Sequence, residues 1–398
     1  MMLKLRRVRV LTGLFIALAM LAGACGSDEA APAATTAAPA APDAPDAPAA
    51  PDAPATTAAP ATTAAPAPEE VDDAGAAAVT GDMTVLDEMT SVSLQTDWFP
   101  STDQAASYAA EALGFFEKRN LDVEIRPGGP GIRAANDIVT GDVTFGVALA
   151  ENVVLASAAG GEFVTFFTTY QESSIGLMTH AEAGISDVHD LTVVQMFPGQ
   201  VFWEVLKFEN DLDVEEISFD GSTAAWLENS DWAVQAAGTT SPHFARLQGA
   251  DPVMYTGTDL GFRTYQATVF TSDSYAEENP DVVRAFAEAL QEGLEAFLED
   301  PDPVIAHIND VFPDFEIEVG EAAVPTMREL TTSETTEELG LGAMDGQVWR
   351  DLADRMYSAG VIDNAVDGDD LWTNEFLIGP DDAGAAAVTG DMTVLDEM

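Results

Sequence analysis

The sequence has one cysteine, Cys25, in 398 residues, so no internal disulfide bond can form. Lysine is nearly as scarce, because only Lys118 and Lys207 follow the first 25 residues. Schiff-base catalysis requires a lysine near its cofactor, and nucleophilic cysteine catalysis requires a free thiol in the folded part. The four histidines show no metal-ligand spacing with one another. These absences argue against an enzyme and predict neither a cofactor nor a metal.

Basic residues are few, with 15 Lys and Arg against 69 Asp and Glu. Four of the basic residues and none of the acidic ones precede Cys25, which leaves 15 − 4 = 11 against 69 after it, a formal charge of −58. Nucleic acid and anionic lipid surfaces repel such a chain, so neither is expected as a partner. A saline habitat, where salt screens self-repulsion, fits this composition.

The first 25 residues have the pattern of a secretory signal. Four basic residues precede an apolar run from Val10 to Leu21, and small residues lead to Cys25. The letters "LAGAC" resemble a bacterial lipobox, in which the cysteine is lipidated, although Ala22 stands where leucine is usual. The alternative is an ordinary cleaved signal with a chance cysteine. We expect an extracytoplasmic protein that Cys25 anchors by lipid to the outer face of the cell membrane.

A long segment rich in Ala, Pro, Asp and Thr follows, and it contains hardly any large apolar residue up to about Val79. Such a segment cannot bury enough surface to offset its ordering entropy, so residues 26–89 are predicted to be a disordered tether. Residues 72–89, "DDAGAAAVTGDMTVLDEM", recur letter for letter at 381–398. A recent duplication or an assembly error explains this identity better than a structural repeat does. We assign the tail, 379–398, no function.

Between tether and tail, short apolar runs alternate with helical patterns, which is typical of an α/β fold with mostly parallel strands. The predicted strands are "VSLQTDW", "DVEIRPG", "VTFGVA", "FVTFFTTYQ", "LTVVQMF", "EEISFDG", "WAVQAAG", "DPVMYTG" and "TYQATVFTSD". A long amphipathic helix with Val282, Phe286, Leu290, Leu294 and Phe297 on one stripe follows, and helices continue to about 357. The predicted domains are lobe I, residues 90–177 and 265–378, and lobe II, residues 178–264.

Three ordered segments resemble the solute-binding proteins of ABC importers: "DWFPSTDQAASYAAEALGFFEKRNLDVEIRPGGPG", "TGDVTFGVALAENVVLASAAG" and "FTSDSYAEENPDVVRAFAEAL". The resemblance covers roughly residues 91–330 and is greatest to a branch that includes binders of pyrimidine thiamine precursors. It implies a two-lobed type II periplasmic binding protein, with a flanked, mostly parallel sheet in each lobe and a ligand cleft between the lobes. It also implies a monomer whose partners are a small-molecule ligand, an ABC permease and its ATPase.

The same resemblance leaves several ligands open. A pyrimidine precursor of thiamine is the first expectation, and riboflavin, nitrate, sulfonate and taurine are the alternatives. The family also includes a eukaryotic branch that synthesises the thiamine pyrimidine and consumes pyridoxal phosphate, but the missing lysine and secretion argue against that chemistry here. Relatives commonly show Asn and His where this chain has Ser101 and Gln104.

Ligands of open α/β sheets bind beyond the carboxyl ends of the strands, and the resemblance places its cleft at the same loops. After the first strand, Trp98 could stack on a flat ring or fill the core, and Asp97 could accept a hydrogen bond from a ring amine or cap its loop. Gln104 and Tyr108 follow on the next helix. Tyr108 is expected equally in the cleft and in the lobe core.

Later loops supply the other candidates. Glu151 could read ring amines or be a helix-terminal acid, and Tyr170 and Gln171 follow the fourth strand. From lobe II, closure over the ligand would use Phe197, Thr240 and Ser241. "PGGPG" at 127–131 could bind an anion through its amides or form a tight turn, and Arg126 and Arg133 flank it as cations or as solvated surface residues.

Overall fold

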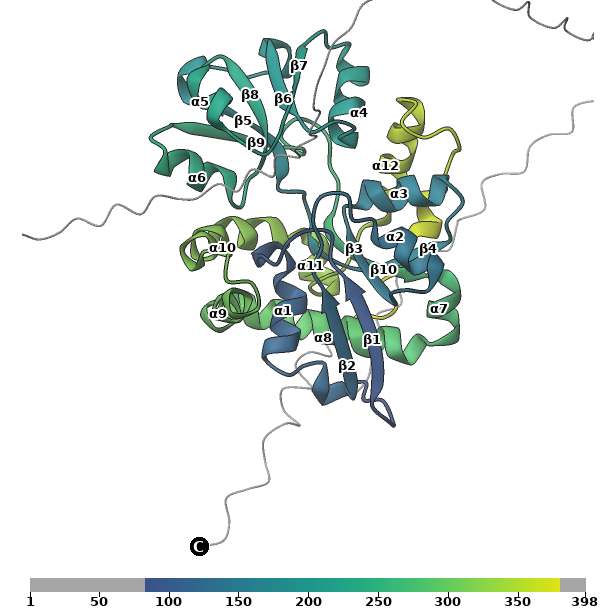
Figure 1. The fold of residues 1–398 in the computed structure, drawn as a ribbon. Coiled ribbons are helices and arrows are strands. Elements are labelled where there is room, and N and C mark those ends of the chain that lie inside the picture. Colours follow the sequence, from purple (N-terminus) through teal and green to yellow (C-terminus); the bar gives the residue numbers. More distant parts are fainter. Residues whose placement is uncertain (1–82, 380–398) are drawn as a thin grey trace, which may run out of the picture. The chain divides into compact units, whose positions relative to one another are not determined.

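The structure is a computed structural model that describes residues 83–379. The predicted signal peptide, Cys25, the tether up to residue 82 and the repeated tail from 380 onward lie outside the described residues. Two five-stranded sheets dominate the described part (Figure 1). The first sheet has the order β2-β1-β3-β10-β4, built from β1 (Thr90–Gln95), β2 (Leu121–Arg126), β3 (Phe145–Ala148), β4 (Phe163–Tyr170) and β10 (Gln266–Ser272).

The second sheet repeats this plan with the order β7-β6-β8-β5-β9. Its strands are β5 (Ile175–His180), β6 (Val193–Met196), β7 (Glu215–Ser218), β8 (Trp232–Ala237) and β9 (Pro252–Thr256). In both sheets the fourth strand runs antiparallel to its two neighbours, and the other pairings are parallel. These antiparallel strands, β10 and β5, are the first strands that the chain forms after passing from one sheet to the other.

Helices cover the sheets. Those before the return to the first sheet are η1 (Thr102–Gln104), α1 (Ala105–Ala112), η2 (Glu117–Arg119), α2 (Ala134–Thr140), α3 (Ala150–Ala158), η3 (Ala181–Ala183), η4 (Val188–Asp190), α4 (Val201–Asn210), α5 (Ala224–Glu228) and α6 (Ser241–Leu247). Those after it are α7 (Asp273–Glu278), α8 (Pro280–Glu299), α9 (Asp302–Val311), α10 (Ile317–Thr331), α11 (Glu334–Leu339), α12 (Gly346–Ser358) and η5 (Gly368–Leu371).

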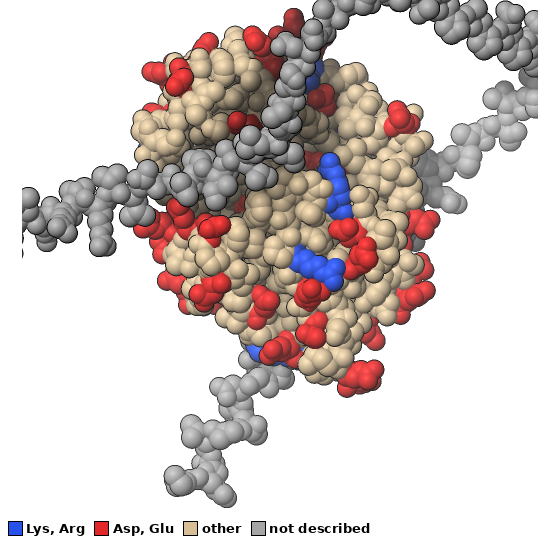
Figure 2. All heavy atoms as spheres, in the orientation of Figure 1, with Lys and Arg blue, Asp and Glu red and all other residues tan. Residues whose placement is uncertain are grey.

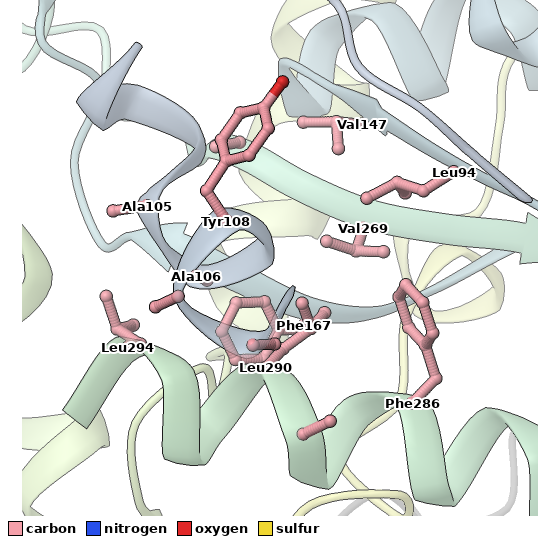
Figure 3. Close-up of a cluster of buried hydrophobic side chains, with 14 of the residues drawn as sticks. Leu94, Ala105, Ala106, Tyr108, Val147, Phe167, Val269, Phe286, Leu290 and Leu294 are labelled. Atoms are coloured by element: carbon pink, nitrogen blue, oxygen red, sulfur yellow. The ribbon is translucent and has the colours of Figure 1, made fainter. Parts of the chain in front are cut away.

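The main core lies between the first sheet and helices α1 and α8. Figure 3 shows side chains of β1, β3, β4 and β10 above the apolar stripe of α8. Four of the five stripe residues predicted from the sequence, Phe286, Leu290, Leu294 and Phe297, are fully buried, and Val282 is partly buried. The alanine-rich sequence of α1 allows a close approach to α8, because a Cβ added at Gly293 would lie 2.5 Å from the carbonyl oxygen of Ala106. This packing fixes α1, and with it the loop after β1.

The predicted α/β fold with two sheets is confirmed, and within the described residues no strand of either sheet follows Ser272. The strand β5 was not predicted, because Gly176, Thr179 and His180 dilute its apolar pattern. Residues 175–177, which the sequence assigned to lobe I, pair with β8 and β9 of the second sheet. That boundary therefore lies before Ile175.

The predicted start of the folded part also needs correction. Residues 84–89 were assigned to the disordered tether, but Thr84 donates hydrogen bonds from its backbone N–H and its hydroxyl to the two carboxylate oxygens of Glu288, each at 2.8 Å. Leu86 packs partly buried against the main core. These contacts order the segment directly before β1. Among the described helices, none is long and apolar enough to cross a membrane.

Candidate functional site

The loop after β1 holds Asp97 in a short chain of hydrogen bonds. Ser101 caps η1 by accepting a hydrogen bond from the Asp103 N–H at 3.3 Å. Its hydroxyl donates to Oε1 of Gln104 at 3.1 Å, and Nε2 of Gln104 donates to Oδ1 of Asp97 at 3.3 Å. Gln104 is itself buried, so its amide orients the Asp97 carboxyl group. The sequence-predicted pair Asp97 and Gln104 is thus brought together.

A second carboxyl group, that of Asp103, lies in the same region and was not named from the sequence. The hydroxyl of the fully buried Tyr170 donates to Oδ1 of Asp103 at 2.8 Å. Burial raises the pKa of Asp103, and the hydroxyls of Tyr170 and of Thr239, which follows β8 of the second sheet, offset part of this rise, although the Thr239 hydroxyl makes no hydrogen bond. Groups from both sheets therefore meet at Asp103.

Both carboxyl groups are harder to ionise than usual. Protein atoms surround Asp97, which keeps only partial solvent exposure, and this desolvation followed by the negative charge of Asp103 raises the pKa of Asp97 to about 6. Desolvation likewise raises the pKa of Asp103. Burial and the charge of Asp103 raise the pKa of Tyr170 well above its ordinary value, so its hydroxyl remains a donor. The cluster is rich in acceptors and would gain from a solute that brings hydrogen-bond donors.

Trp98 is 45% exposed, which excludes a purely packing role for its ring. The neighbouring Phe99 is 43% exposed, but its ring stacks on Phe312 at 5.9 Å with an interplanar angle of 1°. Trp98 meets Phe99 edge to face at 5.6 Å. Phe99 and Phe312 therefore support the indole from one side, and a large aromatic surface remains accessible next to Asp97.

The "PGGPG" segment forms a tight turn against the loop after β1. The Gly128 N–H donates to the carbonyl oxygen of Trp98 at 3.0 Å and to Oγ1 of Thr96 at 2.9 Å. A Cβ at Gly128 would lie 2.2 Å from the Thr96 carbonyl oxygen, so only glycine fits there. Of the two roles left open by the sequence, the turn is therefore favoured, because the Gly128 amide already has protein partners.

The two arginines beside this turn differ in their contacts. Arg126 binds the Glu124 carboxylate through Nε at 3.0 Å and Nη2 at 2.7 Å, and it donates to the carbonyl oxygen of Asp142 at 2.8 Å. Arg133 is an exposed residue that precedes α2. Figure 2 shows the wider setting, in which acidic side chains are scattered over this face and basic ones are few. An anionic solute would find little compensating charge here.

Of the two roles left open for Glu151, its placement favours the helix-terminal acid. It is 4% exposed in the first turn of α3, and the hydroxyl of Thr264 donates to its Oε2 at 2.7 Å. Thr264 belongs to the segment that returns the chain to β10, and its carbonyl oxygen accepts from the Ser173 N–H in the other crossing segment at 2.9 Å. Burial raises the pKa of Glu151 to about 7. The carboxyl group thus lies at the junction of the two crossings.

Two other predicted ligand residues are occupied by contacts within the protein, Gln171 through hydrogen bonds and Tyr108 through packing of its ring. The Gln171 side chain donates to the carbonyl oxygen of Ala343 at 2.9 Å and accepts from the Ser333 hydroxyl at 2.9 Å. Tyr108 is 1% exposed and belongs to the main core, where its ring is drawn in Figure 3. Of the two expectations for Tyr108, its placement favours the core.

The second sheet contributes aromatic and hydroxyl groups beyond its carboxyl ends. Phe197 lies 4.8 Å from Phe219 between ring centroids, and its N–H donates to the Gln235 side chain at 3.0 Å. Ser241 accepts from the Ala237 N–H at 3.1 Å, whereas the Thr240 side chain makes no cap hydrogen bond. In residues 83–379 no group of three or more His, Cys, Asp or Glu side chains is arranged to hold a metal ion.

Comparisons with known proteins agree with this architecture. The family described as NMT1/THI5 like matches residues 101–304, just over half of the chain. The chain belongs to the NMT1/THI5-like family. Among curated proteins, the riboflavin-binding protein RibY of Chloroflexus aurantiacus is 26% identical over 313 residues, which cover 72% of this chain and 86% of that protein.

Solved structures establish the fold of this NMT1/THI5-like protein. The periplasmic aliphatic sulphonate-binding protein SsuA of Escherichia coli aligns with a TM-score of 0.56 at 16% identity, over 70% of this chain and 91% of that one. The alkanesulfonate-binding protein SsuA of Xanthomonas axonopodis pv. citri, bound to MOPS, aligns with a TM-score of 0.52 at 15% identity, over 72% and 100%. The chain is therefore an NMT1/THI5-like protein with the fold of the periplasmic binding proteins.

Proposed function

We propose that this chain captures a flat, nitrogen-containing heteroaromatic solute outside the cytoplasm and delivers it to an ABC permease. The observation that supports this proposal most directly is the pair of carboxyl groups of Asp97 and Asp103 beside the exposed Trp98 ring. Tyr170 holds the Asp103 carboxyl group in place by donating a hydrogen bond to it. Ring N–H and amine groups would donate to the carboxylates, and the indole would cover one ring face. Residues of the second sheet, Thr239, Thr240 and Phe197, would complete the enclosure when the lobes close.

The charges of the cluster argue against the anionic alternatives. Nitrate, sulfonate and taurine each carry an anionic group that two carboxylates would repel. Arg126, the nearest cation in the sequence to the glycine-rich turn, is already paired with Glu124 at 2.7 Å. A donor-rich or protonated heterocycle would instead relieve the mutual repulsion of Asp97 and Asp103, which is one cause of the raised pKa of Asp97.

An aminopyrimidine precursor of thiamine is our first candidate. Its exocyclic amine and protonatable ring nitrogen present adjacent donors, which match a carboxylate well. Riboflavin is the second candidate, supported by the relationship to RibY. Its isoalloxazine N–H stands between two carbonyl oxygens, which suits two carboxylates less well, but its larger ring gains more from stacking and its sugar hydroxyls are donors.

Thermal unfolding with a ligand panel tests this proposal. At 100 times the Kd, a ligand stabilises the native state by about 2.7 kcal/mol, which should raise the melting temperature by about 5 °C. We expect that shift with the aminopyrimidine or riboflavin, and none with taurine, an alkanesulfonate or nitrate. Asp103→Asn should abolish it, whereas Glu321→Gln, an exposed acid on α10, should not. A shift produced only by the anions would overturn the proposal.

We propose further that Cys25 carries the lipid that anchors the protein to the outer face of the membrane. The signal-like segment before Cys25 and the long tether after it support this. Cys25→Ala should release the protein into the soluble extracytoplasmic fraction, as fractionation and immunoblotting would reveal. Undiminished membrane retention of the variant would contradict the anchor.

A further inference from the structure

The segment before β1 occupies a defined site on the first sheet's helices. Thr84 donates twice to Glu288, as described above, and the Leu86 N–H donates to the carbonyl oxygen of Arg119 at 3.2 Å. The Asn120 side-chain amide donates to the Leu86 carbonyl oxygen at 2.6 Å. We call Arg119, Asn120 and Glu288 the clasp site.

The clasp site is cross-linked by hydrogen bonds and largely buried. Arg119 is fully buried and donates to Glu288 Oε2 at 3.4 Å, to Glu292 Oε2 at 3.0 Å and to the Phe115 carbonyl oxygen at 3.2 Å. Glu288 is 4% exposed, so its two oxygens are fixed in place for an incoming peptide. A preorganised carboxylate of this kind binds an N–H and a hydroxyl at little ordering cost.

The other end of the described chain lies close to the same site. The Ile378 N–H donates to Oε1 of Gln291 at 2.7 Å, and Nε2 of Gln291 donates to the Ile378 carbonyl oxygen at 3.2 Å. Gln291 follows Glu288 by three positions on α8, so the two side chains are neighbours on one helix face, about 4.5 Å apart along the axis. The chain thus leaves the described structure one helical turn from the clasp site.

The sequence beyond that point contains a second copy of the peptide that the clasp site holds. Residues 381–398 repeat residues 72–89 letter for letter, so Thr393, Val394 and Leu395 correspond to Thr84, Val85 and Leu86. Every contact described above uses a backbone group or the Thr and Leu side chains. Fifteen residue steps separate Ile378 from Thr393, a reach of about 50 Å when extended, which is ample for one helical turn.

We propose that the clasp site is a binding site for either copy, and that the chain's own C-terminal copy, through Thr393–Leu395, can replace Thr84–Leu86 there. The N-terminal copy is favoured, because only residues 87–89 separate it from β1, whereas residues 379–392 separate Ile378 from Thr393. Loop-closure entropy then favours the N-terminal copy by roughly tenfold. Exchange would free residues 84–89 and lengthen the connection to the preceding segment by about 20 Å.

Amide hydrogen exchange on the full-length mature chain tests this competition. The double substitution Thr84→Pro with Leu86→Asp removes both donors to Glu288 and the apolar contact of the N-terminal copy, and it also makes the two copies distinguishable by mass. We expect amide exchange at Thr393 and Leu395 to slow at least tenfold in this variant relative to the intrinsic rate. Exchange at the intrinsic rate would overturn the proposal.

Thermal unfolding supplies the matched controls. Thr393→Pro with Leu395→Asp should leave the melting temperature unchanged, because the favoured copy is intact. Altering both copies should lower it further than altering the N-terminal copy alone, and equal melting temperatures for those two variants would refute exchange. Protection that depends on protein concentration, with dimers seen by light scattering, would assign the second copy to another chain and overturn the proposal for the chain's own segment.

Discussion

Replacing Trp98 with alanine separates binding from packing at the loop after β1. The residue is 45% exposed, and an aromatic side chain of this size has about 250 Å² of surface. If a solute covers half of the exposed part, it buries about 55 Å² of indole, worth about 1.4 kcal/mol. Stacking adds about 1 kcal/mol, so Trp98→Ala should weaken binding about fifty-fold.

Titration calorimetry with the solute that raises the melting temperature would measure this loss. Two variants serve as controls. Phe208→Ala removes an aromatic ring that is 59% exposed on α4 and should leave affinity unchanged. Phe99→Ala removes the stacking partner of Phe312 and should lower the stability as well as the affinity. If Trp98→Ala bound the solute as tightly as the parent protein, the indole would not be a wall of the site.

Two further predictions concern the framework of the site. Gly128→Ala should lower both stability and affinity, since its Cβ would lie 2.2 Å from the Thr96 carbonyl oxygen, and thermal unfolding and calorimetry would record both losses. Burial raises the pKa of Glu151 from 4.5 to about 7, so the native state binds this proton more tightly than the unfolded state does. The native state therefore loses stability, on the order of 3 kcal/mol, as the pH rises from 4.5 to 7. Glu151→Gln keeps an acceptor for Thr264 and lacks that loss, so it should be the more stable protein above pH 7 in thermal unfolding; equal pH profiles would contradict the buried acid.

Local sequence patterns predict most of the strands and helices of the fold. Nearly every strand of the two sheets was predictable because each is an apolar run bounded by turn residues, and the stripe on α8 is visible in the spacing from Phe286 to Phe297. β5 was missed because Gly176 near its start and Thr179 and His180 at its end interrupt the apolar pattern. Its strand conformation depends on pairing with both β8 and β9, which no local signal encodes.

The residues of the candidate site likewise divide into those that the sequence predicts and those that depend on tertiary contacts. Asp97 and Trp98 could be named because they follow a strand, and the rule about carboxyl ends needs only the chain order. Asp103 was missed because its partner Tyr170 lies 67 positions away and joins it only after β1 and β4 enter one sheet. Gln171 was named for its position after β4, but tertiary contacts with Ala343 and Ser333 occupy its amide.

The pH dependence of binding tests the role of Asp97 in hydrogen bonding. Its carboxyl group has a pKa of about 6 and must be ionised to accept hydrogen bonds from a donor-bearing solute. For a solute that stays neutral, such as riboflavin, affinity should therefore be constant above about pH 7 and fall up to tenfold per pH unit below 6. An aminopyrimidine that gains a proton in the same range should instead bind most tightly near pH 6, because the complex holds one proton, whereas the separate partners hold two below this range and none above it. Calorimetry from pH 5 to 8 would measure both profiles. For the neutral solute, Asp97→Asn should remove the part of the pH dependence that comes from Asp97 and leave only the part that comes from Asp103. An unaltered slope in Asp97→Asn would show that the titrating group is not Asp97.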